Sequence, residues 1–83
     1  MDVCGFPNPF NRDLWVEYDL PREQAVNVSV FNVLGQKVAT LVNERMATGH
    51  HTVSWTPQVT GGVYFVSLRT LSATRTTKVL YLP

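Results

Sequence analysis

Short runs in which apolar and polar residues alternate dominate this 83-residue chain and constrain its fold most strongly. In residues 14–20, apolar side chains alternate with Trp15, Glu17 and Asp19. A period of two is typical of a β-strand with one buried face and one solvated face. Further strands are predicted at 25–31, 37–42, 50–55, 62–70 and 75–82.

Turn-forming residues separate these runs. Pro21 and Pro57 each follow a run, and proline cannot donate to a strand ladder. Asn32 and Gly35 mark a hairpin turn, because Asn can bond its own backbone and Gly can adopt positive φ. The polar stretch 43–49 is expected to be a loop, with room for a helical turn. Strands at this spacing predict an all-β fold, an antiparallel immunoglobulin-like β-sandwich of about six to seven strands.

The beginning of the chain differs from the rest in composition. Pro7 and Pro9 lie within four residues, and each lacks a backbone N–H and fixes φ, so neither suits a central strand. We therefore expect residues 1–12 to be an extended, proline-rich lead-in and residues 13–83 to form the sandwich.

The overall charge argues against two kinds of partner. Seven Lys and Arg oppose six Asp and Glu, which gives a net charge of +1. Nucleic acid and anionic membrane surfaces both require a basic stripe, so neither is expected as a partner. No apolar run is long enough to span a membrane.

Cys4 is the only cysteine, so an internal disulfide is excluded. It can serve in an intermolecular disulfide or lipid attachment, or be a thiol without a role.

No constellation of catalytic residues emerges from the chain. His50 and His51 are adjacent on a predicted strand, so they point to opposite faces and are poorly placed to share a metal ion. Glu17 and Asp19 lie on a solvated face that does not tune the pKa of a carboxylate. Nucleophile-elbow and phosphate-binding glycine motifs are missing. We therefore expect no enzyme activity, no metal and no cofactor.

Three aromatic residues fall on the solvated side of their strands: Trp15, Phe31 and Phe65. Exposed aromatic side chains form binding platforms for carbohydrate or protein partners. The alternative is that one of these face assignments is wrong.

Five stretches, taken in order, resemble the type A C-terminal sorting domain of type IX secretion cargo proteins of Bacteroidetes. They are PNPFN (7–11), VEYDLP (16–21), VSVFNVLGQKV (28–38), GHHTVSW (49–55) and GVYFVSL (62–68), followed by a lysine near the end. The chain is also similar to the immunoglobulin-like module of flagellar hook-capping proteins.

The resemblance implies a non-catalytic address label at the C-terminal end of a longer exported protein. Its expected partners are proteins of the secretion machinery and an N-terminal passenger domain. The expected location is secreted or cell-surface, reached through the periplasm. The candidate recognition residues implied by the family motifs are Pro7, Asn8, Pro9, Phe10, Gly62, Tyr64 and Lys78.

Each of the last three candidates also has a structural interpretation. Gly62 opens a strand after a Gly-Gly turn, Tyr64 is a core residue whose hydroxyl needs a partner, and Lys78 blunts an edge strand against aggregation. An alternative function is an adhesive or self-assembling extracellular module that pairs through its edge strands.

Overall fold

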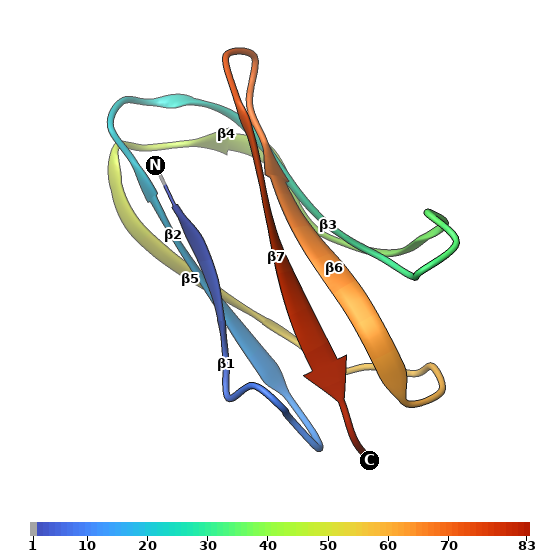
Figure 1. The fold of residues 1–83 in the computed structure, drawn as a ribbon. Helices are drawn as coiled ribbons and strands as arrows, with labels where there is room; N and C mark the ends of the chain where they lie inside the picture. Colours follow the sequence, from blue (N-terminus) through green and yellow to red (C-terminus); the bar gives the residue numbers. More distant parts are fainter. Residues whose placement is uncertain (1) are drawn as a thin grey trace.

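The computed structural model describes residues 2–83, which form two antiparallel sheets packed face to face (Figure 1). One sheet has the strand order β1-β2-β5 and the other β4-β3-β6-β7. The all-β antiparallel sandwich expected from the sequence is confirmed. The strands are β1 (Val3–Phe6), β2 (Leu14–Leu20), β3 (Gln24–Phe31), β4 (Lys37–Met46), β5 (Gly49–Trp55), β6 (Gly62–Arg69) and β7 (Thr74–Tyr81).

The core lies between the two sheets and contains the residues that alternate inward along each strand. In β2 the inward residues are almost fully buried, whereas Trp15 between them is 46% exposed. Because successive side chains of a strand point to opposite faces, one apolar residue in two is enough to build each wall. The buried apolar residues are Phe10, Leu14, Val16, Tyr18, Leu20, Val26, Val28, Val30, Trp55, Tyr64, Val66, Leu68 and Val79.

The loop expected at 43–49 is wrong for most of its length. Strand β4 continues to Met46, and Asn43 and Arg45 pair with Asn27 and Ala25 of β3. This part of β4 is the edge of its sheet, so backbone pairing with β3 holds it while most of its side chains remain in solvent. Side chains on an edge strand need not be apolar, and the alternation that signals a strand is therefore lost.

Strand β1 lies inside the segment expected to be an extended lead-in. It pairs antiparallel with β2, with Phe6 opposite Trp15. At four residues it is too short for the period of two to be recognised. The division of the chain at residue 12 stays a prediction.

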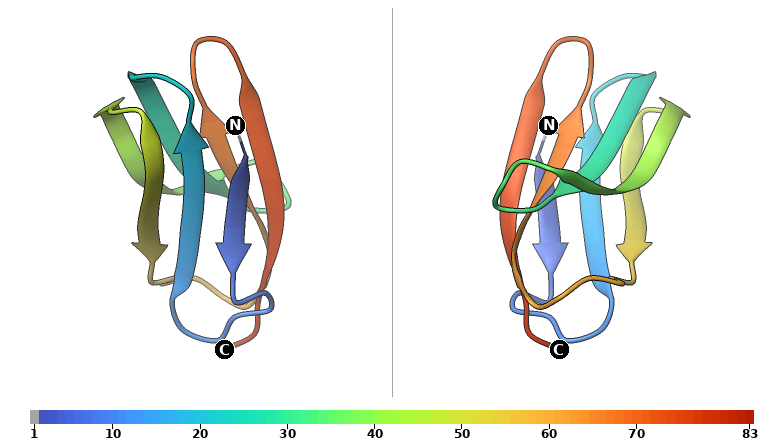
Figure 2. Two further views of the ribbon diagram at one scale, coloured as in Figure 1. Left: turned by 90° about the vertical axis from the view of Figure 1, so that its left-hand side faces the viewer. Right: turned by 90° about the vertical axis from the view of Figure 1, so that its right-hand side faces the viewer.

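Strands β1 and β7 are edges of different sheets that lie side by side (Figure 2). Gly5 permits this approach. A Cβ atom at Gly5 would lie 3.0 Å from Cγ1 of Val79 and 3.4 Å from Cδ1 of Leu14. A larger residue at position 5 would push β1 away from β7. Because glycine has no side chain, the two edge strands can approach closely and close this side of the sandwich.

Candidate recognition site

The segment that contains Pro7 and Pro9 docks along the outer edge of β7. The N–H of Phe10 donates to the carbonyl of Leu80 at 2.9 Å, and the N–H of Leu82 donates to the carbonyl of Phe10 at 2.8 Å. Phe10 and Tyr81 thus form a parallel bridge. Proline is compatible with this position because the segment needs only the N–H of Phe10 for its pairing.

The side chain of Asn8 extends the same pairing toward the middle of β7. Its Nδ2 donates to the carbonyl of Lys78 at 3.1 Å, and its Oδ1 accepts from the N–H of Leu80 at 3.0 Å. The two bonds flank Val79, as the two backbone bonds of Phe10 flank Tyr81. In a parallel pair one residue bonds to both neighbours of its partner in this way. The carboxamide of Asn8 therefore substitutes for a peptide group and occupies otherwise open positions on the β7 edge.

The ring of Phe10 anchors the segment in the core. Phe10 is 2% exposed and stacks on Tyr81 with ring centroids 5.0 Å apart. Trp55 lies 6.0 Å from Phe10 and meets the ring of Tyr64 edge-on at 5.6 Å. Aromatic pairs at these separations stabilise a core beyond the area that they bury. We call Phe10, Trp55, Tyr64 and Tyr81 the aromatic cluster.

Tyr64 meets the expectation for a core residue. It is 6% exposed, and its hydroxyl donates to the carbonyl of Thr60 at 2.6 Å. Gly62 lies two residues earlier and pairs with Tyr81 across the β6–β7 ladder. Its φ of 150° is one that residues with a side chain rarely adopt. The structural interpretations of these two residues are thus supported by their geometry.

Lys78 has an exposed side chain on the outward face of β7, opposite Phe65 of β6. Its carbonyl accepts the bond from Asn8. The chain therefore uses the backbone of Lys78 to hold the N-terminal segment and leaves the ammonium group in solvent.

All seven candidate residues lie around β7 and the first residues of β6, the strand paired with it. Pro7, Asn8, Pro9 and Lys78 are exposed and form the accessible part. Phe10 and Tyr64 are buried, so a partner cannot touch their rings without unfolding this end of the domain. Direct recognition through these residues stays a prediction.

The sequence did not identify Leu80, Tyr81 and Leu82 as members of this site. Leu80 and Leu82 take part through backbone groups, for which side-chain identity carries no signal. Tyr81 could have been recognised as a member of the aromatic cluster only once β6 and β7 were aligned, because its partner Phe10 lies 71 positions earlier in the chain.

The two histidines point to opposite faces of β5, as predicted. His51 stacks on Tyr18 with ring centroids 5.4 Å apart. On the outer face, Nδ1 of His50 lies 2.8 Å from Oδ1 of Asp19, and Nε2 lies 3.7 Å from Oε2 of Glu17. The hydrogen bond to Asp19, supported by the charges of both carboxylates, raises the pKa of His50 above its usual value.

Nothing in residues 2–83 brings together three His, Cys, Asp or Glu side chains that could hold a metal ion. No helix within the described range is long and apolar enough to cross a membrane.

The predicted outer-face aromatics do lie on the outer faces. Trp15 and Phe6 are neighbours on β2 and β1 and are 46% and 40% exposed. Phe31 and Phe65 are cross-strand neighbours on the other sheet and are partly buried.

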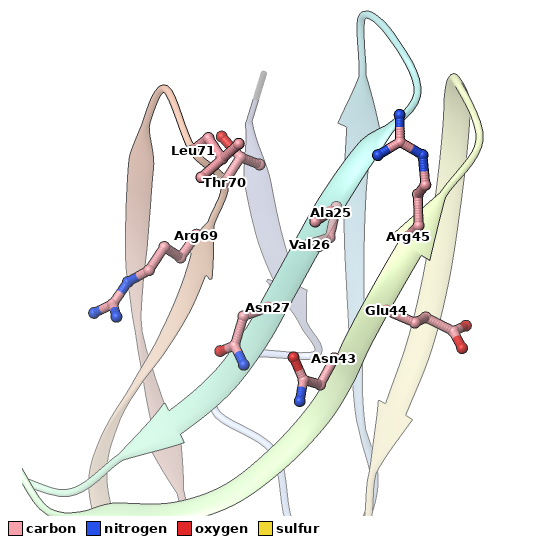
Figure 3. Close-up of a pocket in the computed structure, with 9 residues that line it drawn as sticks. All are labelled: Ala25, Val26, Asn27, Asn43, Glu44, Arg45, Arg69, Thr70 and Leu71. Atoms are coloured by element: carbon pink, nitrogen blue, oxygen red, sulfur yellow. The ribbon is translucent and has the colours of Figure 1, made fainter.

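An open pocket of about 270 Å³ lies on β3, β4 and the end of β6, away from the candidate residues. Figure 3 shows Asn27 and Asn43 close together at this pocket, with Arg45 and Arg69 extending to either side. Arg45 forms a salt bridge with Glu23, in which Nε of Arg45 lies 2.7 Å from Oε2 of Glu23. None of the residues that line this pocket belongs to a family motif or to the candidate residues, so the pocket and the candidate recognition site are separate.

Comparison with known proteins gives a family and no individual relative. Searches of curated proteins and of solved structures found no match. The model of one family, described as the secretion system C-terminal sorting domain, matches residues 5–81. The match begins within β1, runs to the end of β7 and includes all seven candidate residues. The chain therefore belongs to the family of secretion system C-terminal sorting domains, as its sequence motifs predicted.

Proposed function

We propose that this domain is the type IX sorting signal of a longer exported protein, placed C-terminal to a passenger domain and read by the secretion machinery. The proposed destination is the cell surface or the medium, reached through the periplasm. The proposal assigns no catalytic step and no cofactor to the domain. The observation that carries it is the family match over residues 5–81.

The geometry of the candidate site supports a role as a folded signal. Asn8 and Phe10 tie the N-terminal segment to β7 through four hydrogen bonds. A receptor that binds a rigid surface loses less conformational entropy than one that must order a loop. Pro7, Asn8, Pro9 and the Lys78 ammonium form an accessible surface on this rigid end.

Export of a passenger tests the proposal. Residues 1–83 are fused behind a signal peptide and a fluorescent passenger in a type IX-competent bacterium, with a secretion-defective strain as the control. We expect passenger outside the outer membrane in the competent strain only. Passenger retained in the periplasm of both strains, with the domain folded, would refute the sorting role.

Self-association through edge strands is the second candidate function. Strands β4 and β5 are both edges, and no strand of residues 2–83 pairs with their outer sides. An open edge can accept a strand from another chain. Sedimentation velocity over a range of concentrations tests this candidate. A monomer at every concentration would refute it.

A further inference from the structure

The connection between β3 and β4 stands off the outer face of its sheet (Figure 1) and extends across β6 and β7 (Figure 2). It carries two adjacent exposed aliphatic side chains. Val33 is 68% exposed and Leu34 is 79% exposed. We call residues 32–36 the β3–β4 tip. Single apolar residues on a surface are common, but here two of them stand together at the end of a protruding hairpin.

Asn32 holds the β3–β4 tip in one conformation. Its Oδ1 accepts from the N–H of Leu34 at 2.9 Å and from the N–H of Gln36 at 3.0 Å. Its Nδ2 donates to Oε1 of Gln36 at 2.8 Å. Two backbone hydrogen bonds close the turn. The N–H of Gly35 donates to the carbonyl of Asn32, and the N–H of Asn32 donates to the carbonyl of Gln36. The two aliphatic side chains are thus presented on a preorganised loop, which reduces the entropy lost on binding.

The sheet face behind the tip is basic. Across β4, β3, β6 and β7, the residues Lys37, Phe31, Phe65 and Lys78 form one row of cross-strand neighbours. Arg69 lies further along the same face. Side chains share a face with their cross-strand neighbours, and no carboxylate occupies an outward position on these four strands. Glu44, the only carboxylate within the four strands, pairs with the inward-facing Val26.

We propose that the β3–β4 tip docks into an apolar pocket, rimmed by carboxylates, on a protein of the export machinery. This inference rests on the proposed sorting function. The pocket would take Val33 and Leu34, and the carboxylates would face Lys37 and Lys78. Complementary charge at the rim mainly speeds association and selects the partner, while the apolar anchor holds the complex.

The decisive variant is Val33→Ser combined with Leu34→Ser. Both residues are exposed and outside the core, so the double variant is expected to fold. Leu71→Ser is the matched control, since Leu71 is 101% exposed in the turn between β6 and β7, which Figure 1 shows at the top of the molecule and apart from the β3–β4 connection. In the passenger assay we expect export of the double variant to fall about tenfold or more, which corresponds to about 1.4 kcal/mol of binding free energy. The Leu71→Ser control should be exported like the wild type.

Two Asn32 variants separate the rigidity of the tip from its chemistry. Asn32→Ala keeps Val33 and Leu34 but removes the three side-chain hydrogen bonds. Asn32→Asp keeps an acceptor for both backbone N–H groups. We expect export to fall in Asn32→Ala and to be largely retained in Asn32→Asp.

The outcomes distinguish the two proposals. Failure of the wild-type domain to export its passenger refutes the sorting function, and the docking inference with it. Wild-type export with full export of the folded double variant overturns the docking inference alone. A wild-type dimer in sedimentation velocity that the double variant loses would make a second copy the occupant of the tip, and would also overturn it.

Discussion

At the residue scale, Asn8 has the most specific role that the structure assigns. One carboxamide satisfies a donor and an acceptor on the edge of β7. The sequence motif marked Asn8 as a candidate for recognition, and the structure adds a reason for asparagine itself. Only a side chain with both an N–H and a C=O can reproduce a peptide group at this position.

Replacing Asn8 by alanine should reduce the free energy of unfolding by about 1–2 kcal/mol, because two hydrogen bonds of modest net value are lost. Asn8→Asp can still accept from Leu80 but cannot donate to Lys78, so its loss should be intermediate. Urea denaturation of the three proteins measures the differences. Equal stability of the wild type and Asn8→Ala would show that the edge pairing contributes nothing.

The pKa of His50 offers a second test at this scale. Its hydrogen bond with Asp19 stabilises the protonated ring, so the folded pKa lies above the unfolded one. The resulting stability is fully present below the unfolded pKa of about 6.5 and is lost as the pH rises through the folded value. We expect Asp19→Asn to lower the pKa of His50 in an NMR titration. An unchanged titration curve would contradict the assigned cause.

At the element scale, the sequence predicted strands where one face is buried and failed where it is not. The runs that became β2, β3 and β6 carry apolar residues at every second position because the core selects them. The end of β4 lies on an edge with mostly polar side chains. Backbone pairing alone specifies that segment, and no side-chain pattern records it.

The aromatic cluster joins four elements: the segment before β2, β5, β6 and β7. Trp55→Ala and Tyr64→Ala should each destabilise the domain by roughly 3–5 kcal/mol, since each leaves a large cavity between the sheets. Phe65→Ala, on the outer face of β6, is the control and should cost less. Thermal unfolding followed by circular dichroism measures the three values. A cooperative transition unchanged by either core substitution would refute the assignment of the core.

At the scale of the whole molecule, two parts of the candidate site far apart in the chain could not be joined from the sequence. The motif at residues 7–10 and Lys78 each appeared as a separate recognition element. The hydrogen bonds from Asn8 to Lys78 and to the neighbouring Leu80 span 70 and 72 positions. Contacts of this separation depend on the complete sandwich, so they emerge only when all seven strands are in place.

Truncation at the expected boundary tests how far the sandwich depends on its first residues. A chain of residues 13–83 would lack β1 and the ring of Phe10. We expect it to be less stable by at least the roughly 3–5 kcal/mol typical of removing one buried phenylalanine ring. Chemical denaturation of the two chains measures the difference. Equal stability would support residues 13–83 as the complete folding unit.

The docking of the N-terminal segment on β7 also has a mechanical consequence. Traction from a passenger attached ahead of residue 2 would first peel β1 from β2, one pair after another, as a local opening of the edge. The load would then reach Phe10, where two backbone bonds to β7 and a buried ring resist together. Asn8 would share that load from the adjacent position. The domain could thus yield at its first strand under tension while the remaining strands keep their shape.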